Sequence, residues 1–212
     1  MKVGILGSGD VGKALGRGFV KYGHEVTIGT REPGKLADWQ KEVGARGHAG
    51  SFADAAKFGE MIVLATLWTG THPALEMAGL DHFKGKVVID ATNPLDFSHG
   101  MPPHLALGVT DSGGEQVQRW LAGARVVKAF NTVGNNLMVD PQLPGGPPDM
   151  FIAGNDAAAK KTVTDVLTQF KWNTIDVGGI EGARLLEPLC LLWVVTAMQG
   201  NHWTQAFKLL RA

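Results

Sequence analysis

The chain has 212 residues, enough for one hydrophobic core or for a domain with a small addition. Its 20 basic and 20 acidic residues cancel, so the overall charge indicates neither a nucleic-acid nor an anionic-membrane partner. One cysteine excludes a disulfide within the chain, and no apolar run reaches the ~20 residues that a membrane span needs. We therefore expect a cytoplasmic protein with small-molecule partners and no membrane contact.

Short β-forming runs alternate with helical patterns along the chain. Strands are expected at residues 2–6, 25–28, 61–65, 86–89, 125–129, 149–153 and 173–177. Helices are expected after the first strand, at 34–43, 53–58 and 115–121, after Asp156, and from Gly182 to the end with a break near Gly200. This alternation predicts an α/β fold of the Rossmann type, doubly wound, with a mainly parallel sheet of about eight strands and a small C-terminal helical portion.

The sequence GSGDVG at residues 7–12 follows the first strand directly and opens a helix. In this context Gly7 permits the tight turn, Gly9 lets the backbone approach a pyrophosphate, and Gly12 lets helix and strand pack closely. The helix N-terminus supplies free N–H groups and partial positive charge to phosphates. A glycine-rich turn without a ligand is the alternative, and the strand–turn–helix context favours a dinucleotide site.

The end of the second strand indicates which dinucleotide is bound. NAD-binding folds place an acidic residue there for the ribose 2′-hydroxyl, whereas NADP-binding folds place an arginine nearby. This chain has Thr30 and Arg31, followed by Lys35. A hydroxyl and two cations suit a 2′-phosphate, which predicts NADP(H). The alternative is that Arg31 and Lys35 are ordinary surface charges.

Further strand ends carry residues suited to the nicotinamide half: ATLW at 65–68, DATNP at 90–94 and AFNT at 129–132. Ligands of open α/β sheets lie beyond the carboxyl ends of the strands. Asn93 and Asn131 would bond to amide or ribose groups, and Leu67 or Trp68 would pack on a ring. The alternative is that Asn93 and Pro94 form part of a turn and that Trp68 belongs to the hydrophobic core.

No evident proton donor accompanies these residues. The only tyrosine, Tyr22, lies on the first helix, and the histidines lack metal-ligand spacing, so neither a catalytic side chain nor a metal site is predicted. A flavin or deazaflavin acceptor would need no proton donor from the protein, because such rings accept hydride at one atom and exchange other protons with water.

Several segments resemble a known family, the NADPH-dependent coenzyme F420 reductases (F420:NADP oxidoreductases). The N-terminal GILGSGD at 4–10 with the GTR at 29–31 carries this resemblance, and ARLLEPL at 183–189 extends it. The sequence VVKAFNT at 126–132 is similar to the NADPH-binding domain of the six-transmembrane metalloreductases. Residues 67–68 and 90–108 depart from the reductase pattern.

The resemblance implies an NADP-binding domain over residues 1–178 and a C-terminal helical portion over 179–212 that completes the cleft. NADP(H) would lie on the first part, with F420, FMN or FAD facing it as hydride acceptor. By residue match the contacts would be Gly7, Ser8, Gly9, Asp10 and Val11 at the pyrophosphate, Thr30, Arg31 and Lys35 at the 2′-phosphate, and Ala65, Thr66, Leu67, Asn93, Ala129 and Asn131 at the nicotinamide half.

Two other functions stay open at this point. One is an NADPH-dependent reductase of a small imine or carbonyl, with His99, His104 or Lys128 as proton donor. The other is a non-catalytic NADPH-sensing module. The helix over residues 185–198 is apolar on nearly all sides, which favours deep burial and predicts a homodimer.

Overall fold

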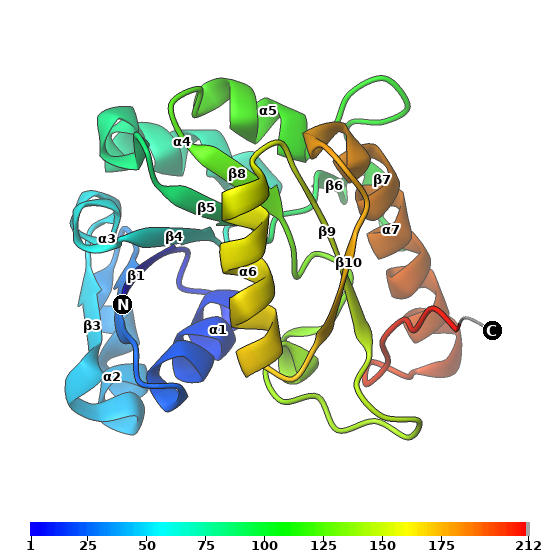
Figure 1. The fold of residues 1–212 in the computed structure, drawn as a ribbon, viewed down its shortest axis with the longest axis horizontal. Helices are drawn as coiled ribbons and strands as arrows, with labels where there is room; N and C mark the ends of the chain where they lie inside the picture. The colour runs from blue at the N-terminus through cyan, green and yellow to red at the C-terminus, as the bar shows by residue number, and fades with distance from the viewer. Residues whose placement is uncertain (211–212) are drawn as a thin grey trace.

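The computed structural model describes residues 1–210, which form one eight-stranded sheet with helices on both faces (Figure 1). The strands are β1 (Lys2–Leu6), β2 (Glu25–Gly29), β3 (Gly47–Gly50), β4 (Met61–Leu64), β5 (Val87–Asp90), β8 (Arg125–Lys128), β9 (Asp149–Gly154) and β10 (Asn173–Asp176). Their order is β10-β9-β8-β5-β4-β1-β2-β3. Only the β8–β9 pairing is antiparallel within this sheet, so the prediction of a mainly parallel Rossmann-type sheet is confirmed.

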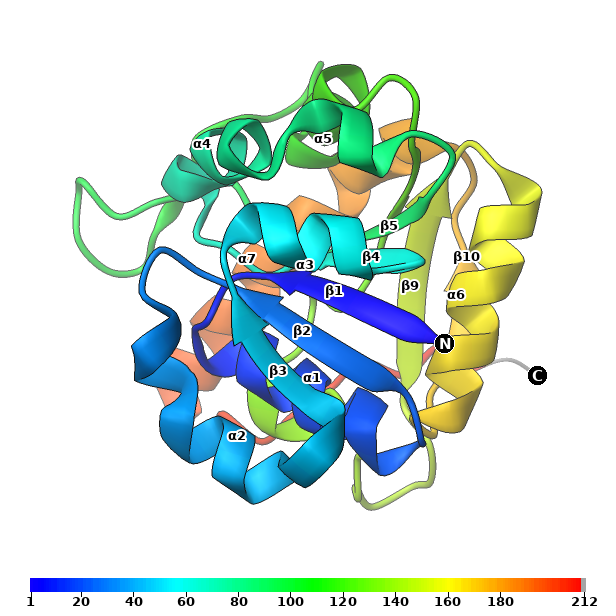
Figure 2. The same cartoon turned by 90° about the vertical axis from the view of Figure 1, so that its left-hand side faces the viewer.

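The helices divide between the two faces of the sheet. They are α1 (Asp10–Lys21), α2 (Ala37–Val43), α3 (Phe52–Phe58), α4 (Trp68–Ala78), α5 (Gly113–Trp120), α6 (Ala157–Gln169) and α7 (Ala183–Gly200). One apolar core joins α1, α2 and α6 to the sheet and the other joins α3, α4 and α5 to it (Figures 1 and 2). Side chains of β1 alternate between these cores, with Ile5 in the first and Leu6 in the second.

Helix α7 is tied to the rest of the molecule by charged groups. Arg184 donates to both carboxylate oxygens of Glu115 on α5, at 2.8 and 2.5 Å. Asn201, in the left-handed region at φ 51°, follows the last residue of α7 and ends it.

Several elements differ from the sequence predictions. The short strands β6 (Leu95–Asp96) and β7 (His104–Leu105) form a separate antiparallel pair in a segment where no strand was predicted. Strand β3 was not predicted because Gly47 and Gly50 give it little β propensity. Helix α4 was not predicted because it contains Pro73 and begins among threonines and a glycine. Residues 201–210 were predicted to be helical, but the main chain of Phe207 accepts a hydrogen bond from Asp149 at the start of β9, which holds this segment in a non-helical course.

Candidate functional site

The glycine turn at the carboxyl end of β1 is as tight as its sequence requires. Gly7 has φ +123°, and a Cβ there would lie 2.3 Å from the carbonyl oxygen of Ala65. A Cβ on Gly12 would lie 2.0 Å from the carbonyl oxygen of Gly7. Gly9 faces open space and precedes α1 without a capping side chain, so the first N–H groups of α1 are left for a ligand.

This turn opens on a cleft of about 1150 Å³. Most of the residues proposed for cofactor binding line it, namely Gly7, Ser8, Gly9, Asp10, Val11, Thr30, Arg31, Ala65, Thr66, Leu67 and Asn93. Trp68, Ala91 and Thr92, which belong to the strand ends singled out in the sequence, line it as well. Residues that the sequence did not single out also line it, among them Phe52, Thr69, Gly70, Pro73, Met77, Leu95, Asp96, Phe97, Ala106 and Asn135. Lys35, Ala129 and Asn131 are not among its lining residues.

The proposed 2′-phosphate end has one ordered hydroxyl and one exposed cation. Thr30 Oγ1 accepts a hydrogen bond from Ser8 Oγ at 3.0 Å, which links the end of β2 to the glycine turn. Arg31 is exposed at the cleft and has no ion-pair partner within residues 1–210. Lys35 Nζ instead lies 2.7 Å from Glu32 Oε1, and this bond lowers the pKa of Glu32. The positive charge facing the cleft therefore comes from Arg31.

The two asparagines proposed for the nicotinamide half have different places. Asn93 lines the cleft, whereas Asn131 is 2% exposed behind it, beside the fully buried Ala129. Asn93 Nδ2 donates to the main-chain oxygen of Asn131 at 2.9 Å, and Asn131 Nδ2 donates to Asn93 Oδ1 at 3.1 Å. Asn131 thus contacts the cleft through Asn93.

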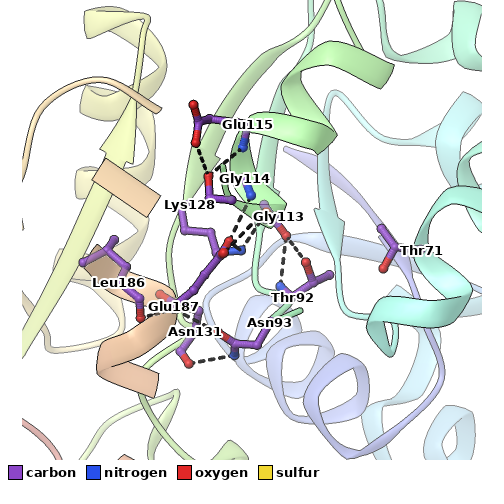
Figure 3. A network of polar contacts seen from close by, with 12 residues as sticks. Thr71, Thr92, Asn93, Gly113, Gly114, Glu115, Lys128, Asn131, Leu186 and Glu187 are labelled. Atoms are coloured by element: carbon purple, nitrogen blue, oxygen red, sulfur yellow. Dashed lines mark hydrogen bonds and ion pairs between the residues drawn. The ribbon is translucent and has the colours of Figure 1, made fainter. Parts of the chain in front are cut away.

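A buried charge cluster lies beneath this pair (Figure 3). Lys128 Nζ is 3.0 Å from Asp90 Oδ2 and 2.8 Å from Glu187 Oε1, and none of these residues is more than 2% exposed. Burial alone would lower the pKa of Lys128, but the charges of Asp90 and Glu187 outweigh it and raise this pKa. Held between two carboxylates and away from solvent, Lys128 is unsuited to be the proton donor of the imine or carbonyl alternative.

The other end of the cleft is mostly apolar. Trp68, Pro73 and Met77 come from α4, and Phe97 follows the short strand β6 (Leu95–Asp96), which pairs with β7 (His104–Leu105). Trp68 is stacked on Trp120 of α5 with ring centroids 5.5 Å apart. Trp68 was expected to pack on a ring, but the rest of this wall was not predicted, because its residues belong to α4 and the β6–β7 hairpin, two features that the sequence did not predict.

The titratable groups near this apolar end are few. His99 and His104 are exposed and do not line the cleft, although their rings lie 5.7 Å apart. Asp96 does line it, and hydrogen bonds from Ser98 lower the pKa of its carboxyl group, which keeps it ionised at neutral pH. Cys190 does not line the cleft, and burial raises the pKa of its thiol to about 12.

The described residues, 1–210, contain neither a metal cluster nor a helix suited to cross a membrane. No group of three or more His, Cys, Asp or Glu side chains there is arranged to hold a metal ion. None of the helices in that part of the chain combines the length and apolar character of a membrane span.

The fold and the cleft define a protein of the Rossmann-type dinucleotide-binding class. A family model described as "NADP oxidoreductase coenzyme F420-dependent" matches residues 2–94. The F420-dependent NADP reductase of Methanocaldococcus jannaschii is 31% identical over 206 residues, which cover 92% of this chain and 91% of that one. The chain belongs to the family of F420-dependent NADP reductases and is an NADP-dependent oxidoreductase.

Three further proteins are similar to this chain. The crystal structure of a candidate F420-dependent NADP reductase from Arthrobacter sp. FB24 is 41% identical, has a TM-score of 0.94 and covers all of both chains. The metalloreductase STEAP3 of Rattus norvegicus is 27% identical over 93% of this chain, which spans 38% of that longer protein. An imine reductase from Myxococcus stipitatus, at 19% identity and a TM-score of 0.71, shares the fold, with 95% of this chain and 63% of that chain covered.

Proposed function

We propose that this enzyme transfers hydride between NADP(H) and a deazaflavin or flavin of the coenzyme F420 type. The supporting observation is the division of one cleft into two kinds of surface. One end has the glycine turn and Arg31, and the other has an apolar wall without a His, Lys or Tyr among its described lining residues. A redox ring needs stacking more than a protein proton donor, so this combination favours a ring acceptor.

NADP(H), when bound, supplies the hydride at its nicotinamide ring. The main-chain N–H groups at Ser8, Gly9, Asp10 and Val11 would hold the pyrophosphate against the N-terminus of α1. Thr30 and Arg31 would contact the 2′-phosphate, and Lys35 would join them only by leaving Glu32. Ala65, Thr66, Leu67 and Asn93 would border the nicotinamide half, with Ala129 and Asn131 behind them.

The acceptor ring would lie against the apolar wall. Trp68 is fixed by its stacking on Trp120, whereas Met77 and Phe97 are each 51% exposed and so retain apolar surface for a ligand to cover. Leu67 also lines the cleft and is 79% exposed, so it too has apolar surface that a ligand could cover. The wall would exclude water and hold two rings at a reacting distance of about 3–3.5 Å.

A second candidate is reduction of a small cyclic imine. The observation that favours it is Asp96, an ionised carboxylate among the residues that line the apolar end. An iminium ion already carries its proton and its positive charge would be attracted by this carboxylate, so the absence of a donor would matter less. The shared fold of the imine reductases carries no argument about activity.

An acceptor screen separates these functions. NADPH oxidation is followed with F420, FMN, FAD or a cyclic imine as acceptor, with NADH in place of NADPH as control. We expect F420 or a flavin to accelerate oxidation of NADPH and not of NADH. Turnover with the imine alone would favour the second candidate. Tight NADPH binding without turnover on any acceptor would support a sensing module and contradict both.

We also propose that the enzyme is a cytoplasmic homodimer with a domain division at residue 178. Support for the dimer comes from Leu185 and Leu192, which are 69% and 51% exposed on α7 and would be covered by a second subunit. Mass measurement in solution at micromolar concentration tests this, and a species of only 22.5 kDa would contradict it.

A further inference from the structure

Asn131 joins the C-terminal helix to the cleft. Its Nδ2 donates to the main-chain oxygen of Leu186 on α7 at 2.8 Å and to Asn93 Oδ1 at 3.1 Å (Figure 3). Both N–H groups of this amide are therefore used, one on a helix outside the sheet and one on a side chain that lines the cleft.

Asn93 is held by the same residue from two sides. Its Oδ1 accepts from the Asn131 side chain, and its Nδ2 donates to the Asn131 main chain at 2.9 Å. Rotation of the Asn93 amide would break both bonds. One N–H of Asn93 remains without an assigned partner within residues 1–210 and is available to a ligand in the cleft.

The segment of α7 that anchors Asn131 is itself fixed by charge. Glu187, next to Leu186, accepts N–H bonds from Gly113 and Gly114 at the start of α5, at 2.9 and 3.0 Å, and contacts Lys128. A carboxylate at a helix N-terminus is favourable, and removal of one partner from a buried ion pair is strongly unfavourable. The Leu186 carbonyl is thus held at a set position relative to β8.

Folding stability does not explain this asparagine well. Asn131 Oδ1 is buried and has no hydrogen-bond partner within residues 1–210. An unpaired buried acceptor costs free energy that an apolar side chain of the same size would avoid. An asparagine at position 131 is better explained by the orientation that its two N–H groups give to the Asn93 side chain relative to Leu186.

We propose that Asn131 is a positioning residue that transmits the position of α7 to Asn93 and so orients the Asn93 amide toward the nicotinamide half of NADP(H). The proposal rests on the proposed function, because it assigns that half of the cleft to nicotinamide. It also gives α7 a part in cofactor binding without direct contact.

The test compares NADP⁺ with 2′,5′-ADP, a fragment that keeps the 2′-phosphate and lacks the nicotinamide. Dissociation constants are measured for the wild type, Asn131→Ala, Asn93→Ala and the double variant. Loss of one hydrogen bond predicts about fivefold weaker NADP⁺ binding in Asn131→Ala, with 2′,5′-ADP unchanged. The double variant should bind NADP⁺ no more weakly than Asn93→Ala, because Asn131 acts through Asn93.

Two further variants keep the test decisive. Asn136→Ala removes an exposed asparagine that bonds to Thr204 outside the cleft, and it should change neither constant. Asn131→Leu fills the same space without N–H donors, and it should reproduce the NADP⁺ effect if Asn131→Ala does not fold.

Three results would overturn the proposal. The first is that Asn131→Ala weakens the binding of 2′,5′-ADP as much as that of NADP⁺. The second is that the effects of Asn131→Ala and Asn93→Ala on NADP⁺ binding multiply in the double variant. The third is that the wild type binds NADP⁺ no more tightly than 2′,5′-ADP. Failure of every acceptor to oxidise NADPH would contradict the proposed function, and these binding constants would still decide the role of Asn131.

Discussion

At its proposed phosphate end the cleft is formed by a turn between β1 and α1, whereas at its proposed acceptor end it is formed by side chains of α4 and the β6–β7 hairpin. The first end presents main-chain N–H groups whose positions follow from three glycines in six consecutive residues. The second presents Trp68, Met77 and Phe97, which tertiary packing brings together. The proposed phosphate site is therefore a local property of the chain, and the proposed acceptor site is a property of the folded molecule.

The largest expected effect is at the phosphate end, from Gly9→Val. A Cβ at Gly9 would meet no protein atom within 4 Å, so the melting temperature should stay close to that of the wild type. The valine side chain would occupy the space that a pyrophosphate needs, and we expect NADPH binding about 100-fold weaker, or roughly 2.8 kcal/mol. Gly108→Val, also in open space and outside the cleft, is the control. Unchanged NADPH affinity would show that the turn is not the phosphate site.

Arg31→Ala should have the next largest effect. Loss of a charge-assisted bond to the 2′-phosphate predicts NADPH binding about tenfold weaker, with NADH binding unchanged. Lys35→Ala is the comparison, and we expect a change of about twofold or less because Lys35 is 69% exposed and paired with Glu32. Titration of both nucleotides by fluorescence measures this. Equal effects of the two variants would contradict the assignment of the cleft charge to Arg31.

A smaller effect is expected at the acceptor end, from Phe97→Ala. Phe97 is half exposed, so covering the rest of its ring is worth about 1 kcal/mol, which predicts a KM for the acceptor about fivefold higher. The dissociation constant of NADPH should not change. Val109→Ala removes an apolar side chain that is 91% exposed and does not line the cleft, and it serves as control. Weaker NADPH binding in Phe97→Ala would remove the distinction between the two ends.

The same distinction explains what could be predicted from the sequence. The glycine turn and the Thr30–Arg31 strand end follow directly on strands, so their local pattern was enough to predict where they lie. Lys35 belongs to the same pattern, but its bond to Glu32 lies at a 3₁₀ turn over Pro33–Leu36, where the sequence predicted the first residues of the helix at 34–43 without this ion pair.

The positions of the remaining site residues depend on contacts with distant parts of the chain, which a local sequence pattern does not predict. Asn131 was placed at the correct strand end, yet its burial depends on Leu186, which is far away in sequence. The cluster of Lys128, Asp90 and Glu187 was not predicted either, because each residue comes from a different element. Trp68 was expected to pack on a ring, but Met77 and Phe97 were not, because α4 and the β6–β7 hairpin were not predicted and Pro73 breaks the helical pattern of α4.

Direct hydride transfer between the two ends of the cleft is the central claim, and isotope transfer tests it most directly. NADPH carrying deuterium at the transferable position of the nicotinamide ring is oxidised in the presence of F420, and the reduced deazaflavin is examined by mass spectrometry and NMR. We expect one deuterium on the ring carbon that accepts the hydride. A reduced deazaflavin without deuterium, or no reduction under NADPH, would contradict the account.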